Sequence, residues 1–167
     1  MGVKEIHLNE NNLSGALPAL QLDSLKVAEF AANAITGIGN IQAPKLELLS
    51  ISGNPITQLP VFTLVSLKEL WAGGCQITGS LVQWNTPALE VLNLGYNKLS
   101  ALSAGLNYPK LKYVDLSGNV ITGQLPFWNT PKLEYLHLGS NQLTSVSGEL
   151  NYAHLYYFNI GNNQIAG

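Results

Sequence analysis

The sequence predicts a right-handed solenoid with a parallel β-sheet on its concave face, an extended or 3₁₀ convex side and little α-helix. Two observations lead to this prediction. The 167 residues contain eight copies of one 11-residue pattern whose starts lie 21 or 22 residues apart, and self-similarity at such a period is typical of repeat architectures. Prolines also recur between the copies, where they disfavour helix.

All eight copies read LxxLxLxxNxL with minor substitutions. They occupy residues 3–13, 25–35, 46–56, 67–77, 89–99, 111–121, 133–143 and 155–165. Positions below are counted from the first residue of each copy, and a coil runs from one copy to the residue before the next. The pattern resembles the leucine-rich repeat family, and the resemblance covers the whole chain. It implies one leucine-rich-repeat domain of eight repeats over residues 1–167.

Each copy contains the signature of a short strand. Positions 4 and 6 are apolar, as in Leu92 and Leu94 or Leu136 and Leu138, which is the period-2 pattern of a strand with one buried face. Stacking the copies places one strand per coil in a parallel sheet. With strands about 4.8 Å apart, eight coils make a rod roughly 35 to 40 Å long.

Position 9 predicts a polar column inside the turn that follows each strand. Seven copies carry asparagine there, and the fourth carries Cys75. Because an amide both donates and accepts, it can satisfy backbone groups from one coil to the next. Because no basic residue flanks Cys75, we expect a buried, inert thiol that partly replaces the amide. A reactive thiol is the alternative.

The return half of each coil contributes apolar residues to the core and contains prolines that disfavour a helix. An apolar residue stands five positions before each new repeat, at Leu20, Ile41, Phe62, Trp84, Leu106, Trp128 and Leu150. Prolines follow three positions later at Pro44, Pro87, Pro109 and Pro131. We therefore expect both tryptophans of this column in the core.

Segments after the asparagine turn indicate a second strand. LSGALP, ITGIGN, ITGSLV and ITGQLP resemble the LxGxIP segment of the plant-specific class of leucine-rich repeats, in which it forms a short second strand. The coils are shorter than those of that class, so we expect this strand to be partial. Similar short repeats occur in bacterial and phage surface proteins. A longer period of 44 residues is also present, since ITGSLVQWNTPALE recurs as ITGQLPFWNTPKLE.

Composition excludes several classes of partner. The net charge is −2, and the eight basic residues are all lysine, so the arginine fork that reads phosphates and guanine edges is missing, and we expect no nucleic acid partner. No apolar run approaches the ~20 residues that span a bilayer. We expect no membrane insertion, and the resemblance to surface repeats favours an extracellular or surface-exposed location.

Function is predicted on the concave face, which this family generally uses for binding. Positions 3, 5, 7 and 8 point there, and the carboxy-terminal half combines a tyrosine ladder with hydrogen-bonding groups beside small residues. The candidate ligand-binding residues are Trp71, Asn93, Tyr96, Tyr113, Asp115, Tyr135, His137, Tyr157 and Asn159. Rigid aromatics beside amides are typical of recognition surfaces. The sequence therefore predicts a binding module for a protein or glycan ligand.

Other functions can be compared with this one. In a structural spacer or adhesin shaft, the stacked tyrosines would be cross-strand packing only. A Ser-His-Asp grouping can be drawn from Asp115 and His137 with Ser117 or Ser140, but an open sheet offers no oxyanion hole or water-excluding cleft. Asp115 and His137 are also the only good metal ligands in the carboxy-terminal half of their row. We expect no catalysis, no metal and no cofactor.

Two further features belong to the surface and the ends. Position 12 is almost always serine or threonine, so a regular surface that orders water is a third hypothesis. The first repeat begins at Val3 and the last ends at Ile165, with no recognisable caps. Because open solenoid ends expose core and strand edges, we expect a piece cut from a longer protein, with ends covered by partner copies as the alternative. In both cases we expect end-to-end self-association.

Overall fold

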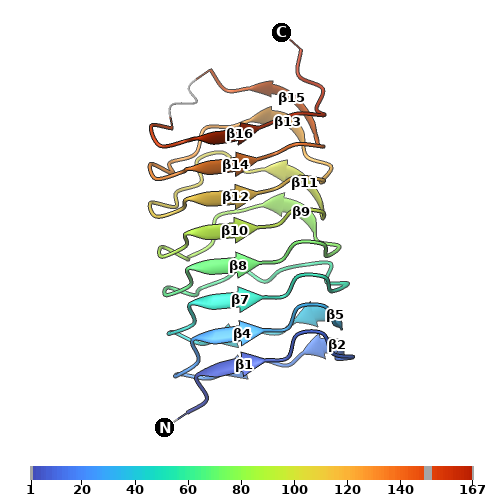
Figure 1. Cartoon of the computed structure of the whole chain (residues 1–167), viewed down its shortest axis with the longest axis vertical. Helices are drawn as coiled ribbons and strands as arrows, with labels where there is room; N and C mark the ends of the chain where they lie inside the picture. Colours follow the sequence, from blue (N-terminus) through green and yellow to red (C-terminus); the bar gives the residue numbers. More distant parts are fainter. Residues whose placement is uncertain (1, 149–151, 167) are drawn as a thin grey trace.

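The computed structural model describes residues 2–148 and 152–166, which form a solenoid with one short strand per coil on one side (Figure 1). These strands make a parallel sheet of eight, in the same order in space as in the chain. They are β1 (Glu5–His7), β4 (Val27–Glu29), β7 (Leu48–Ser50), β8 (Glu69–Trp71), β10 (Val91–Asn93), β12 (Tyr113–Asp115), β14 (Tyr135–His137) and β16 (Tyr157–Asn159). The predicted solenoid with a parallel sheet is confirmed.

Neighbouring strands pair position by position, so each position of the repeat forms a row across the sheet. Tyr113 pairs with Tyr135, which pairs with Tyr157. Position 4 is fully buried in the middle coils, as at Leu70 and Leu136, whereas positions 3 and 5 are half-buried on the opposite face. That opposite face, predicted to be concave, is called the outer face below.

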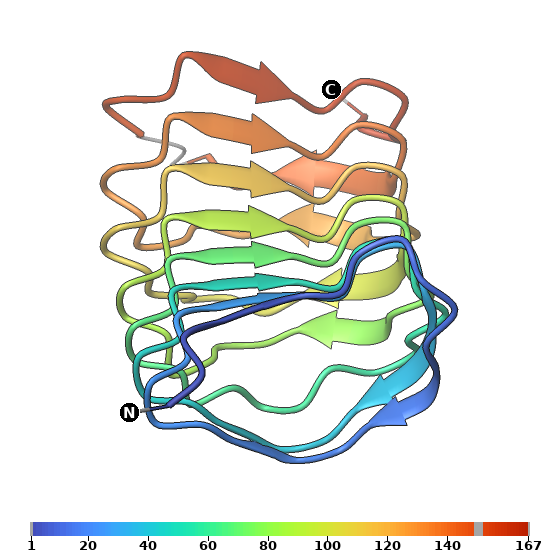
Figure 2. The ribbon, with the colours of Figure 1, turned by 60° about the horizontal axis from the view of Figure 1, so that its bottom comes forward.

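Second strands line the side opposite this sheet (Figure 2). They form three separate parallel pairs, β2 with β5, β9 with β11 and β13 with β15. Their bounds are Ser14–Leu17, Ala34–Ile38, Thr78–Leu81, Lys98–Leu102, Thr122–Leu125 and Gln142–Val146. A fourth pair joins β3 (Leu20–Gln21) to β6 (Ile41–Gln42). Within the described residues this side contains no helix, so the extended alternative of the prediction is correct.

Each of the three longer pairs contains one bulge. The first strand has four residues and a glycine in the left-handed region, with φ of 75° at Gly15, 87° at Gly79 and 80° at Gly123. Its partner has five residues, and the register shifts by one just after that glycine. Glycine reaches this φ without a Cβ penalty, which explains its recurrence in LSGALP, ITGSLV and ITGQLP.

The asparagine column joins successive coils as expected. The Asn97 amide donates to the carbonyl of Ala72 in the previous coil (2.8 Å) and to that of Leu94 in its own (3.0 Å). Its oxygen accepts from the N–H of Ile77 at 2.9 Å. The same pattern recurs at Asn33, Asn54, Asn119, Asn141 and Asn163.

Cys75 changes the coil before it. Its thiol is buried and donates to the carbonyl of Ile51 at 3.4 Å. The N–H of Ile56, which an asparagine oxygen would accept from, turns instead to the carbonyl of Asn54 (2.8 Å). The third coil, residues 46–66, is also the coil that forms no second strand although both neighbouring coils do.

A continuous apolar core fills the solenoid. Phe62, Trp84, Leu106 and Trp128 are all buried, so the tryptophans of the return column belong to the core as predicted. Leu150 of the same column lies outside the described residues. Within the part of the chain that the structure describes, no helix is long and apolar enough to cross a membrane.

Core positions become accessible in the first and last coils. Leu8 is 39% exposed, whereas Phe30, its equivalent in the next coil, is 3% exposed. Phe158 is 41% exposed, whereas Leu136 in the preceding coil is fully buried. Among the described residues, β1 and β16 each pair with one neighbouring strand only, so their second edges lie open.

Candidate functional site

Three tyrosines stack on the outer face. The Tyr113 and Tyr135 ring centroids are 4.5 Å apart with an interplanar angle of 11°, and those of Tyr135 and Tyr157 are 4.2 Å apart with an angle of 4°. Carbon atoms in contact lie about 3.5–4.0 Å apart, so nothing fits between these rings. Both faces of Tyr135 are therefore covered, and the stack presents ring edges and hydroxyls to a ligand. These three residues are the tyrosine ladder.

Trp71 extends the ladder towards the amino-terminal half. It lies on β8, two strands from Tyr113, yet the two ring centroids are 6.2 Å apart with an angle of 37°. The indole N–H donates to the Glu69 carboxylate at 2.9 Å, which fixes the direction of the ring. Glu69 is thus a site residue that the sequence analysis missed. Its position two residues before Trp71, on the same face, was the available signal.

Several polar side chains at position 5 form hydrogen bonds with the backbone two residues later. Asn93, Asp115 and Asn159 each accept a hydrogen bond from the N–H two residues later, at 3.2, 2.9 and 2.9 Å. Asn159 also donates to the Tyr157 hydroxyl at 3.1 Å. His137 packs edge-on against Tyr135 and Tyr157. The row therefore holds its side chains in fixed orientations beside the tyrosine ladder.

Small residues at position 7 are explained by this row. A Cβ on Gly73 would lie 2.6 Å from the Asn93 side-chain oxygen, and one on Gly95 would lie 3.1 Å from Asp115. The position 5 side chains thus lean over the glycine of the preceding coil. The small residues serve to accommodate these polar side chains.

Position 8 adopts the left-handed backbone conformation in all eight coils. The φ angle lies between 53° and 56° at Ala32, Tyr96, Ser140 and Asn162. It is also positive at Glu10, Gly53, Gly74 and Gly118. Tyr96 is 72% exposed, and a Cβ on Gly118 would lie 2.8 Å from its ring. The structure thus places Tyr96 at the edge of the outer face, apart from the tyrosine ladder.

Asp115, His137 and Ser117 do not form a relay. The Ser117 hydroxyl donates directly to Asp115 Oδ1 at 2.7 Å, and Ser117 is buried. His137 Nδ1 lies 3.7 Å from the same oxygen. In a relay the histidine lies between the serine and the aspartate and accepts the hydrogen bond from the serine hydroxyl. Here the serine hydroxyl donates to the aspartate instead.

Comparison with known proteins identifies the fold. Residues 110–129 and 130–150 match two family models described as leucine-rich repeat. The chain has the leucine-rich-repeat fold. A solved leucine-rich repeat protein of Leptospira interrogans shares the fold, with a TM-score of 0.63 and 21% identity over 98% of this chain. This chain covers 50% of that protein. No curated protein matches the sequence.

Leucine-rich repeat domains generally mediate protein binding and are typically non-enzymatic scaffolds. Two phenols of the tyrosine ladder have raised pKa values. Burial, with a contribution from Tyr113, raises the pKa of Tyr135 far above its usual value. Burial and the charge of Asp115 also raise the pKa of Tyr113. Both hydroxyls stay protonated at neutral pH and can donate hydrogen bonds.

A second polar cluster lies at the other end of the outer face. His7 contacts the carboxylates of Glu29 and Glu5, and the hydrogen bond to Glu29, followed by that to Glu5, raises the pKa of His7. In residues 2–148 and 152–166, no three histidine, cysteine or acidic side chains are arranged to hold a metal ion.

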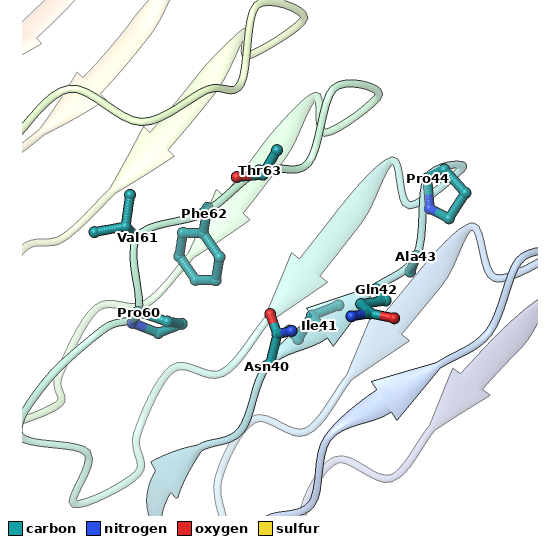
Figure 3. Close-up of a pocket in the computed structure, with 9 residues that line it drawn as sticks. All are labelled: Asn40, Ile41, Gln42, Ala43, Pro44, Pro60, Val61, Phe62 and Thr63. Carbon is teal, nitrogen blue, oxygen red and sulfur yellow. The ribbon is translucent and has the colours of Figure 1, made fainter.

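A pocket of about 390 Å³ opens on the convex side between the second and third coils (Figure 3). Residues 40–44 and 60–63 line it, and none of them is ionisable or among the predicted site residues. Among the described residues β6 pairs with β3 alone, so its second edge faces the third coil without a strand beside it. The pocket therefore lies where no strand of the third coil pairs with β6.

The hydroxyl column at position 12 makes contacts between coils. Thr78 donates to the carbonyl of Thr57 at 3.3 Å, and Thr122 donates to that of Ser100 at 3.4 Å. Such hydroxyl-to-backbone bonds stabilise the stacking of the coils.

Proposed function

We propose that the chain is a non-enzymatic recognition module that binds a protein through the tyrosine ladder on its outer face. The observation that carries the proposal is the stack of Tyr113, Tyr135 and Tyr157 over three neighbouring strands. Tyrosine supplies contact area and a hydroxyl at low entropic cost. The general role of leucine-rich repeats in protein binding supports the same reading.

The stack favours a polypeptide over a glycan. A sugar ring typically packs its C–H groups against the face of an aromatic ring, and both faces of Tyr135 are occupied by its neighbours. Ring edges and protonated hydroxyls suit the carbonyl groups and side chains of a protein segment. Trp71, Asn93, Asp115, His137 and Asn159 then border the contact, with Tyr96 at its rim.

A parallel binding screen tests this proposal. Wild type, Tyr135→Ala and Tyr156→Ala are screened against a displayed protein library and a glycan array. Tyr156 is 77% exposed and lies at position 2, outside the ladder, so it is the matched control. We expect protein ligands whose Kd rises about 30-fold or more in Tyr135→Ala, the range of an interface hot spot, and stays unchanged in Tyr156→Ala.

Each other result overturns the proposal in a different way. Ladder-dependent hits confined to the glycan array would make the ligand a glycan. Hits indifferent to Tyr135→Ala would place the site elsewhere. An absence of specific hits would favour the structural spacer or adhesin shaft. Circular dichroism of the variants checks that each remains folded.

A further inference from the structure

Charge is distributed unequally between the faces of the solenoid. All eight basic residues are lysines, and none occupies positions 3, 5, 7 or 8. Lys4, Lys26, Lys68 and Lys112 stand at position 2, Lys45, Lys110 and Lys132 just before position 1, and Lys98 after the asparagine turn. Carboxylates at positions 3 and 5, in contrast, are Glu5, Glu29, Glu69 and Asp115.

Three of the four lysines at position 2 pair with a glutamate on their own row. Lys26 and Lys68 both pair with Glu47, at 3.4 and 2.6 Å, and Lys112 pairs with Glu90 at 2.8 Å. At the amino-terminal end of the outer face, His7 contacts both Glu5 and Glu29. The acidic character of the outer face is therefore not neutralised by the lysines of the neighbouring row.

Glu69 and Asp115 lack a lysine partner within the part of the chain that the structure describes. Glu69 accepts from the Trp71 indole through one oxygen. Asp115 accepts from Ser117 through one oxygen, with His137 3.7 Å from that atom. Among the described residues, neither carboxylate has a hydrogen bond to its second oxygen. The two acids lie on β8 and β12, on either side of β10.

Aromatic rings lie beside both acids. Trp71 and Tyr113 contact each other at a tilt of 37° with centroids 6.2 Å apart, and among the described residues no other aromatic ring packs on Trp71, so one face of the indole carries no stacked ring. Ring faces attract cations, and arginine is the cation that most often stacks on them. Its planar fork also matches a carboxylate.

We propose that Glu69, Trp71, Tyr113 and Asp115 form a subsite that receives a basic side chain, arginine above lysine, from the protein partner. The inference rests on the proposed function and adds the chemistry of the bound segment. The ladder supplies edge and hydroxyl contacts, and this subsite supplies carboxylates on β8 and β12 together with the Trp71 and Tyr113 rings.

A tripeptide titration tests the subsite directly. Acetyl-Gly-Arg-Gly-amide is titrated into the protein while the Trp71 indole N–H signal is followed by NMR. Trp84 and Trp128 are buried, and Trp71→Phe assigns the signal. The neutral isostere with citrulline in place of arginine is the ligand control. We expect saturable shifts with the arginine peptide, at least 10-fold weaker binding of the citrulline peptide, and weakening by added salt.

Conservative variants locate the effect. Glu69→Gln and Asp115→Asn keep the acceptors for Trp71 and Ser117, and each should weaken the arginine peptide about 3- to 5-fold, as for a partly exposed ion pair. Glu47→Gln, on the lysine row, should change nothing. Equal shifts from both peptides, or binding indifferent to both subsite variants, would overturn the subsite while leaving Tyr135-dependent protein binding intact. Arginine binding without any Tyr135-dependent protein ligand would overturn the proposed function instead.

Discussion

The side-chain oxygen of Asn97 accepts a hydrogen bond from the backbone N–H of Ile77, which belongs to the preceding coil. Through its amide the same side chain also reaches the carbonyl of Ala72 in that coil. One asparagine thus holds two turns of the solenoid together, and it does so while only 7% exposed. Its contribution can be measured against an equivalent residue that lacks these bonds.

Asn97→Ala should lower the free energy of unfolding by about 3 kcal/mol, because it leaves several buried backbone groups without partners. Asn11→Ala is the matched control, since Asn11 is exposed and its amide bonds to the Leu8 and Asn9 carbonyls of its own coil. That variant should cost less than about 1 kcal/mol. Urea unfolding of both variants gives the comparison, and equal losses would contradict the role of the column.

Gly74→Ala tests the left-handed conformation at position 8. Gly74 has a φ of 64°, and alanine there should lower the free energy of unfolding by about 1 kcal/mol. Gly37→Ala is the control, because Gly37 has an ordinary φ and its Cβ would meet Ala16 at 3.6 Å. It should stay within about 0.5 kcal/mol of wild type. Thermal unfolding distinguishes the two, and an unaffected Gly74→Ala would argue against backbone strain.

The imidazole of His7 should titrate above the usual histidine range, since Glu29 and then Glu5 raise its pKa by hydrogen bonding. A histidine whose pKa is raised on folding contributes stability below its unfolded pKa and loses that contribution as the pH rises through the folded pKa. NMR titration of the ring protons measures the shift. Glu29→Gln should lower the pKa more than Glu5→Gln does, and the reverse order would contradict the assignment.

Open edges at β1 and β16 lead to a prediction about association. Phe158 is 41% exposed at a position that is buried in the preceding coil, so we propose that the 167-residue chain self-associates end to end at high concentration. Sedimentation velocity over a concentration series measures this. Phe158→Ser should shift the protein towards monomer, whereas Phe127→Ser, at a convex residue that is 43% exposed, should not. A wild type that remains monomeric throughout would contradict the proposal.

Much of the main sheet was predictable, because the determinants are local. The alternation of apolar residues within each copy placed all eight strands, and the asparagine column followed from the need to satisfy turn backbone groups. Strands β11 and β15 were not predicted, since KLSAL and QLTSV lack the glycine motif and become strands through pairing with the preceding coil. The lack of a second strand in the third coil was likewise not predicted.

The candidate site was likewise predictable only in part. Row membership of the tyrosines followed from counting positions, and the structure places all three in one stack. The lean of Trp71 across β10 towards Tyr113 was not predictable, because it depends on a rotamer fixed by Glu69. That contact joins residues on alternate strands, whereas both faces of Tyr135 are covered by residues on adjacent strands.

The pairing of second strands two by two has a consequence for changing the length of this molecule. Each pair joins a glycine-bearing strand of four residues to a five-residue partner that carries the bulge. Deleting residues 89–110 would bring β9 against β13, two glycine-bearing strands with no bulged partner between them. Deleting residues 89–132, which are two coils, would instead bring β9 against β15, a glycine-bearing strand of four residues beside a five-residue partner. The natural module for engineering a longer or shorter version is therefore the two-coil unit.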